Sequence, residues 1–336
     1  MRFPVWAPLF ATAVIAAIAV PISSSQAATR TAAGPPAATK TSCSGLTPGS
    51  YVPGPSTTGV RAGSVLKTIQ GDLNITAAGT YENLDVHGFV NVKAANVTIR
   101  NSKVRGGVAI GGRGLINSTD ARVSHLLVEG VELVPDHPSY WLDGILGHDY
   151  TAKCVNVYRT VDGFGVFKTQ DPGGPTNVTI TQSFVHELSY FSPDPTHPDN
   201  RTHNDCIQIQ GGSGDVVTYN RLHAYYSSKA GTLPTPRPQS MSAIMLNNNV
   251  GKTTNVLVVG NRIDGGEIAI NGGGLGKYAA ADNLGTFWRN TFDRTQFYAT
   301  HTIDLDAAVT KVDTGDGTSN QNVYTDGTAI KVRHNA

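Results

Sequence analysis

The chain has 336 residues, a formal net charge of +1, 15% charged residues and 39% hydrophobic residues. Binding to nucleic acid or to an anionic membrane requires a clustered basic face, which this near-zero charge does not indicate. We therefore expect neither partner, and the length is ample for a large core.

The first 27 residues have the pattern of a secretory signal peptide. Arg2 lies in a short n-region, an apolar run follows, and small residues end at Ala27. A membrane anchor is the alternative, but the apolar run over residues 11–20 is short for a span and no stop-transfer pattern follows. We expect a secreted, extracellular protein with no membrane contact after cleavage. Residues 28–45, with many Ala, Thr and Pro, should form a disordered leader.

Three cysteines follow the predicted signal peptide: Cys43, Cys154 and Cys206. This odd number permits at most one internal disulfide bond. No CxxC pair and no Cys/His cluster has metal-ligand spacing, so a zinc site is not expected. The sequence predicts one disulfide bond or none, with a leftover thiol.

One strand pattern recurs along the chain from residue 96. It consists of alternating β-branched residues, a small or polar corner residue and a further apolar position. The segments with this pattern are NVTIRNSKV from Asn96, HLLVEGVEL from His125, CVNVYRTVD from Cys154, NVTITQSFV from Asn177, DVVTYNRLH from Asp215, NVLVVGNRI from Asn255 and GTFWRNTFD from Gly285. A sustained repeat of this length indicates stacked coils.

A second family of short strands accompanies the first. Its members are DGILGH from Asp143, DGFGVF from Asp162, DCIQIQ from Asp205, SAIMLN from Ser242 and EIAING from Glu267. Helical periodicity is nearly absent, which argues against βαβ units. An antiparallel sandwich or jelly roll would show hairpin dipeptides between strands. We predict an all-β, single-stranded right-handed parallel β-helix over residues 96–336, with an N-terminal cap and first coils over residues 46–95 and no second domain.

These repeats resemble the right-handed parallel β-helix proteins exported by soil bacteria, a superfamily that includes pectate, alginate and chondroitin lyases and polygalacturonases. The resemblance covers about residues 60–336, judged by the repeat. It implies a polysaccharide-active protein. The segment from His203 to Asp205 resembles the Asn-Thr-Asp segment of polygalacturonases, but their paired Asp-Asp, Gly-His-Gly and Arg-Ile-Lys motifs are absent. The Lys and Arg pair that the lyases combine with calcium has no clear equivalent.

The stretch DCIQIQ provides a candidate binding surface. Strand alternation directs Ile207 and Ile209 inward and Gln208 and Gln210 outward. The same register places Gln210 in an outward column with His148, Asn247 and Asn271, and Gln208 in the neighbouring column. Such an exposed polar ladder suits a sugar chain. The predicted substrate-binding residues are Gln208, Gln210, His148, Asn247 and Asn271.

Three aspartates, Asp143, Asp162 and Asp205, each begin a strand of this second family in successive coils. Strands stack about 4.8 Å apart, so their carboxylates could lie roughly 5 to 10 Å from one another. These separations bracket the two geometries of glycoside hydrolysis. Carboxylates are also the ligands of Ca²⁺, which is the expected cofactor if there is one. The structural alternative is that they cap turns.

The remaining catalytic candidates lie around a long loop over residues 187–202. His203 precedes Asp205 by two residues, and His186 ends the strand before the loop. Lys168 and Arg201 are the nearest cations. With Asp205, these four side chains are the predicted catalytic group, in which histidine is the usual acid or base near neutral pH.

Three functions remain open. A lyase would use Lys168, Arg201 or His203 to remove the proton beside a uronate carboxylate, with calcium on the aspartates. A hydrolase would use Asp205 with Asp143 or Asp162. A non-catalytic binding module would use the polar ladder and aromatic platforms at Tyr140, Trp141, Tyr190, Phe191, Tyr225 and Tyr226. We favour a monomeric lyase of a uronate-containing polysaccharide, partly on fold analogy.

Overall fold

The structure of the protein, a computed structural model, describes residues 43–334 except 228–237, 273–275, 279–282, 307–308, 310 and 316–318. The predicted signal peptide and all but the last three residues of the predicted leader lie outside the described residues. Within the described part, no helix has the length and apolar character to cross a membrane.

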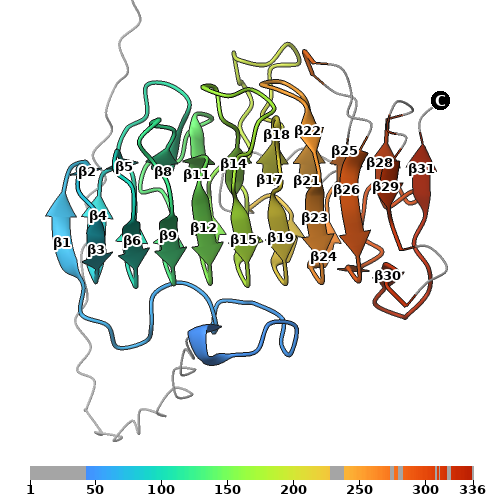
Figure 1. Cartoon of the computed structure of the whole chain (residues 1–336), viewed down its shortest axis with the longest axis horizontal. Helices are drawn as coiled ribbons and strands as arrows, with labels where there is room; N and C mark the ends of the chain where they lie inside the picture. Colours follow the sequence, from blue (N-terminus) through green and yellow to red (C-terminus); the bar gives the residue numbers. More distant parts are fainter. Residues whose placement is uncertain are drawn as a thin grey trace, which may run out of the picture. The chain divides into compact units, whose positions relative to one another are not determined.

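Each coil of the chain passes through three parallel sheets, which we name A, B and C in chain order (Figure 1). Sheet A contains β1 (Lys67–Gln70), β4 (Leu84–His87), β7 (Lys103–Val104), β10 (Glu132–Leu133), β13 (Asn156–Tyr158), β16 (Phe184–His186), β20 (Arg221–Ala224), β24 (Arg262–Gly265), β27 (Thr291–Phe292) and β30 (Val323–Tyr324). Sheet B contains β2 (Leu73–Ile75), β5 (Val90–Val92), β8 (Arg113–Ser118), β11 (Leu142–Gly147), β14 (Phe164–Val166), β17 (Asp205–Ile209), β21 (Ser242–Leu246), β25 (Ile268–Gly272), β28 (Ile303–Leu305) and β31 (Val332–His334). Sheet C contains β3 (Gly79–Glu82), β6 (Val97–Arg100), β9 (Leu126–Glu129), β12 (Tyr150–Lys153), β15 (Thr179–Thr181), β19 (Val216–Thr218), β23 (Val256–Val259), β26 (Asn283–Trp288) and β29 (Lys311–Asp313). A short parallel pair, β18 (Gly212–Ser213) and β22 (Thr253–Thr254), and the 3₁₀ turn η1 (Cys43–Gly45) complete the described elements.

This arrangement confirms the predicted right-handed parallel β-helix. Strands of successive coils pair in parallel, with Phe164 opposite Ile207 in sheet B and Thr179 opposite Val216 in sheet C. The second pair excludes the antiparallel alternative. The repeated sequence segments each contain a sheet C strand, a corner residue and a sheet A strand, so a coil has three strands rather than two. Sheet A strands are only two to four residues long, which is why the sequence pattern joins them to sheet C.

A ladder of buried asparagines fixes the corner between sheets C and A. Asn220, Asn261 and Asn290 donate their backbone N–H to Oδ1 of the asparagine in the next coil, at 3.0 Å each, and the last acceptor is Asn322. The side-chain amides also donate to backbone carbonyls, as Asn261 Nδ2 does to Val217 O at 2.9 Å. Every buried polar group of this ladder therefore has a partner, which buried polar networks need for stability.

The core follows the predicted alternation in β17. Ile207 and Ile209 are fully buried, whereas Gln208 and Gln210 are half-buried. Cys206 is also fully buried, between the paired positions Asp205–Ser242 and Ile207–Ile244, so alternation does not extend to the start of the strand. Cys206 carries a free thiol, and Cys43 and Cys154 form the one disulfide bond that the cysteine count allows.

Residues 43–66 form a segment that runs outside the coils, which we call the N-terminal strap (Figure 1). The disulfide bond ties its start to the corner between β12 and β13. Gln182 Nε2 donates to Leu46 O at 3.3 Å and to the Tyr51 hydroxyl at 3.0 Å. The strap thus lies against the corner between sheets C and A before the chain enters β1.

Candidate functional site

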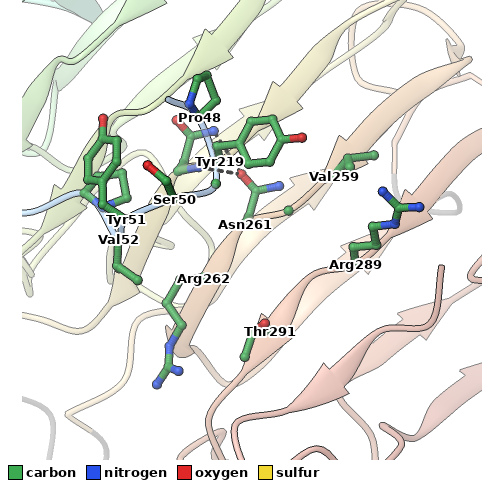
Figure 2. Close-up of a pocket in the computed structure, with 14 residues that line it drawn as sticks. Pro48, Ser50, Tyr51, Val52, Tyr219, Val259, Asn261, Arg262, Arg289 and Thr291 are labelled. Atoms are coloured by element: carbon green, nitrogen blue, oxygen red, sulfur yellow. Dashed lines mark hydrogen bonds between the residues drawn. The ribbon is translucent and has the colours of Figure 1, made fainter. Parts of the chain in front are cut away.

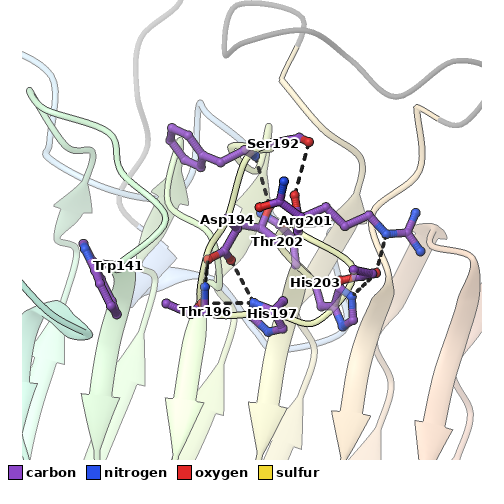
Figure 3. Close-up of polar contacts among 12 residues, drawn as sticks. Trp141, Ser192, Asp194, Thr196, His197, Arg201, Thr202 and His203 are labelled. Atoms are coloured by element: carbon purple, nitrogen blue, oxygen red, sulfur yellow. Dashed lines mark hydrogen bonds and ion pairs between the residues drawn. The ribbon is translucent and has the colours of Figure 1, made fainter.

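Residues 187–204, between β16 and β17, form an insertion that we call the A–B loop (Figure 3). Asp194 lies at its centre with no exposed surface. Its Oδ1 accepts hydrogen bonds from the backbone N–H and hydroxyl of Thr196 at 2.9 and 2.6 Å, and its Oδ2 lies 2.8 Å from Nδ1 of His197. Asn204 Nδ2 donates to Ser189 O at 2.7 Å and to Val161 O at 2.9 Å. The loop is therefore closed on itself and attached to the preceding coil.

The predicted cation and base of the loop share one carboxylate. His203 Nε2 lies 2.8 Å from Oδ2 of Asp199, and Arg201 Nε donates to the same oxygen at 2.7 Å. The hydrogen bond from His203, with a smaller effect of Arg201, lowers the pKa of Asp199 to about 2. The His197 and His203 rings lie 4.7 Å apart. His203 and Arg201 thus form a compact ionic group on the loop (Figure 3).

Asp143, Asp162 and Asp205 form a column in sheet B that we call the aspartate stack. The pairing of Phe164 with Ile145 and with Ile207 aligns Asp162 between the other two aspartates. The backbone N–H of Asp205 donates to Asp162 Oδ1 at 2.8 Å. The sequence correctly predicts three carboxylates in successive coils.

The three carboxyl groups differ in access to solvent. Asp205 is 1% exposed, Asp162 is 6% exposed, and Asp143 retains partial exposure. Gly165 of the next coil leaves room for Leu146, because a β-carbon there would lie 2.5 Å from Leu146 Cδ1, and Asp143 Oδ2 lies beside the same position at 3.4 Å. Asp143 is therefore the open end of the stack and Asp205 the closed end.

Burial, together with repulsion by Asp162, keeps protons on the stack. Burial, and then the charge of Asp162, raises the pKa of both Asp143 and Asp205 well above the usual aspartate value. Burial raises the pKa of Asp162 to about 7. Ser242 of the next coil only partly offsets this rise at Asp205, so the neutral form of Asp205 is favoured. Such groups titrate as a unit, so near neutral pH the stack holds both protonated and ionised carboxyl groups.

Aromatic side chains lie beside the open end of the stack. Trp141, two residues before Asp143, contacts Tyr140 with ring centroids 4.8 Å apart, and Tyr140 packs edge-on to Phe191 of the A–B loop at 6.4 Å. Figure 3 shows Trp141 to one side of the A–B loop. All three rings are partly exposed. Farther into the loop, Tyr190 is mostly buried against Tyr226 at 5.0 Å.

Two other catalytic candidates do not join the ionic group of His203 and Arg201 on the A–B loop. Lys168 Nζ donates to Asp149 Oδ2 at 3.1 Å, at the corner between sheets B and C and beyond the opposite end of β14 from Asp162. His186 lies in sheet A, stacked between Tyr158 and Phe184 at 4.9 and 4.3 Å. Burial lowers the pKa of His186 to about 4, so its ring is neutral near pH 7.

The predicted binding column needs a correction of register. Gln208 pairs with Met245, which pairs with Asn271, so Asn271 belongs to the column of Gln208 and not to that of Gln210. His148 and Asn247 were expected to face outward but are 1% and 4% exposed. Both stand where sheet B ends and the chain turns toward sheet C, so strand alternation no longer applies there. Gln208, Gln210 and Asn271 remain partly exposed.

No group of three or more His, Cys, Asp or Glu side chains that could hold a metal ion occurs in the part of the chain that the structure describes. Ca²⁺ takes six to eight oxygen ligands. The calcium site stays a prediction, and we assign no chemical step to it.

Sequence reasoning missed the loop network of Asp194, His197 and Asp199. The spacing Asp-x-Thr-His from Asp194 is a local signature of a side-chain-closed turn, and Asp199-x-Arg-x-His could have indicated the shared carboxylate. Comparisons with known proteins provide no further guide, because no family model, no curated protein and no solved structure matches the chain. We therefore infer function from the fold and the site geometry.

Proposed function

We propose that the protein is a polysaccharide-active enzyme that hydrolyses glycosidic bonds at the aspartate stack. One observation carries the proposal: three carboxyl groups from successive coils stand in one column, burial raises the pKa of all three, and the charge of Asp162 adds to this at Asp143 and Asp205. Glycoside hydrolysis needs one protonated and one ionised carboxyl group beside the scissile bond. A stack that holds both forms near neutral pH meets this need.

The proposed roles of Asp143 and Asp162 follow from the solvent exposure and the pKa of their carboxyl groups. Asp143, protonated and partly exposed, donates its proton to the glycosidic oxygen. Asp162, whose pKa of about 7 leaves part of it ionised at neutral pH, attacks the anomeric carbon as a carboxylate when the leaving group departs. Adjacent coils are about 4.8 Å apart, which suits the roughly 5 Å separation of retaining enzymes. Water then hydrolyses the glycosyl-enzyme, with Asp143 accepting its proton.

The sugar chain would lie on the outer face of sheet B. Trp141 and Tyr140 offer ring faces for stacking beside Asp143, and Gln208 and Asn271 offer amides farther along the same face. Asp205 is too deeply buried to touch substrate. We assign it a positioning role, in which its N–H orients the Asp162 carboxylate.

A β-elimination lyase is the second candidate, favoured by His203 and Arg201 on the A–B loop. Their shared contact with Asp199 must open before either could take a proton from a uronate. The hydrolase is therefore the favoured candidate.

A panel of polyuronides and neutral glycans tests both proposals. Reducing ends that appear without unsaturated sugars support the hydrolase, and ultraviolet absorbance of unsaturated ends selects the lyase. A protein that binds a polymer but releases neither product would be a binding module, which contradicts both enzymatic proposals.

A further inference from the structure

A second candidate binding site lies at the corner between sheets C and A. Four successive coils place one residue each at the same corner position, all with left-handed backbone: Gln182, Tyr219, Gly260 and Arg289, with φ of 51°, 55°, 69° and 54°. Equivalent positions in successive coils are about 4.8 Å apart along the stack. Tyr219 and Arg289 therefore stand roughly 10 Å apart, two coils removed, with a glycine between them.

The Tyr219 ring fills the space next to this glycine. A β-carbon on Gly260 would lie 2.6 Å from Cε1 of Tyr219, and one on Gly49 of the N-terminal strap would lie 3.0 Å from the same atom. The ring is thus held between the strap and the coil of Gly260. A side chain at residue 260 would displace the ring.

A groove of about 560 Å³ opens beside this ring (Figure 2). Its volume is in the range of small-ligand sites. One wall is the strap from Pro48 to Pro53, and the other consists of corner residues that include Tyr219, Val259, Arg262, Arg289 and Thr291. The lining combines aromatic and proline faces with hydroxyl groups and two guanidinium groups. Flat, partly polar ligands such as sugars match this combination.

The charge of the groove is positive. Arg262 Nε donates to Asp264 Oδ1 at 2.7 Å, and Arg221 pairs with the same carboxylate at 3.3 Å. One negative charge is therefore shared by two arginines. Arg289 is exposed, donates from Nε to the neutral Asn320 Oδ1 at 3.1 Å, and has no ion pair within the described residues. A guanidinium group in this state is suited to a carboxylate, which it can bind through two N–H groups.

We propose that this groove binds a short acidic oligosaccharide, with a sugar carboxylate on Arg289 and a sugar ring against Tyr219. The proposal does not depend on chemistry at the aspartate stack. It does depend on the strap, because the strap forms one wall and the Cys43–Cys154 disulfide bond and Gln182 hold it in place.

Calorimetric titration with trigalacturonate tests the proposal. The measurements use the Asp143→Asn variant, so that turnover cannot obscure binding. We expect Arg289→Gln in this background to weaken binding at least tenfold. Arg100→Gln is the matched control, because Arg100 is also exposed at the end of a sheet C strand but lies outside the groove. The affinity of this control variant for trigalacturonate should equal that of its parent. Equal affinity of the Arg289→Gln variant and its parent would overturn the proposal, as would no binding at all.

Two further arms separate the ligand chemistry and the site. Maltotriose, which lacks carboxylates, should bind at least tenfold more weakly, and inorganic sulfate should not displace trigalacturonate at equal concentration. If sulfate displaces it fully, the groove is a simple anion site and the sugar assignment is wrong. Replacing both Cys43 and Cys154 with serine should weaken binding as Arg289→Gln does. Binding that survives both changes belongs to another surface and also contradicts the proposal.

Discussion

The backbone N–H of Asp205 donates a 2.8 Å hydrogen bond to the carboxylate of Asp162 in the preceding coil. This bond favours the ionised form of Asp162, whereas repulsion by Asp162 favours the neutral form of Asp205. The two aspartates are therefore unequal although they occupy equivalent positions in the repeat. The pKa of Asp162 is about 7, and that of Asp205 is well above the usual aspartate value.

Asp143→Asn should abolish most of the proposed activity. The amide cannot donate a proton to the leaving oxygen, and loss of general acid catalysis lowers kcat by about 10² to 10⁴ fold. The free energy of unfolding should stay unchanged or rise, because repulsion with Asp162 disappears. Release of reducing ends and thermal melting measure the two effects. Asp136→Asn, an exposed carboxylate in the A–B turn of the same coil, is the control and should retain activity.

The aspartate stack should make the protein less stable as the pH rises. The pKa of Asp162 is higher in the folded state than in the unfolded chain, so the folded state binds the proton more tightly. The contribution of the protonated Asp162 to the free energy of unfolding is fully present below about pH 4 and is lost as the pH rises through about 7. Its size is up to roughly 4 kcal/mol. Denaturant unfolding of the protein and of Asp162→Asn at pH 4 and pH 8 checks this. A pH dependence that is identical in the two proteins would contradict it.

Asn261→Ala should destabilise the fold. The substitution removes the side-chain acceptor of the buried Asn220 N–H and the side-chain donor to the Val217 carbonyl, and each such loss costs about 1 to 3 kcal/mol. We expect a total loss of about 2 to 4 kcal/mol in the free energy of unfolding. Asn74→Ala, an exposed asparagine of sheet B with one hydrogen bond to Asn91, should cost under about 0.5 kcal/mol. Similar losses for the two variants would show that the ladder adds no stability.

Asp194→Ala should open the A–B loop without unfolding the coils. The change removes the acceptors of Thr196 and His197, which close the loop. Limited proteolysis should then cut within residues 187–204 faster, while the melting temperature stays within a few degrees because the coils keep their core. Asp171→Ala, an exposed residue of another turn, provides the comparison. If the A–B loop of the Asp194→Ala variant is cut at the same rate as in the parent protein, the backbone alone holds this loop closed.

The repeat predicts the coils because stacked strands must present the same side-chain pattern to the same core. Ile207 and Ile209 therefore have the orientation that alternation predicts. Alternation fails where strands end, as at His148 and Asn247, because a corner turns the side chain to a new direction. The spacing of sequence segments also does not show where one sheet B strand begins relative to the next. For this reason the sequence predicts Asn271 in the column of Gln210, whereas it lies in the column of Gln208.

The candidate site was predictable in part. The three aspartates recur at one position of the repeat, so their alignment follows from the coil period. Lys168 and Asp149 are 19 residues apart and meet only because a coil closes between them. The contacts of Asp199 with Arg201 and His203 depend on how the loop folds over the preceding coil. Neither pairing has a periodic pattern in the sequence.

The burial of Cys206 makes this residue a built-in chemical reporter. It is the one cysteine outside the disulfide bond, it follows Asp205 directly, and it has no exposed surface. Burial, and then the charge of Asp205, raises the pKa of its thiol well above the usual value. A thiol reagent can therefore modify it only when the coil that carries the aspartate stack opens. The rate at which Cys206 is labelled therefore measures the local opening of that coil in the protein of natural sequence, without any engineered probe.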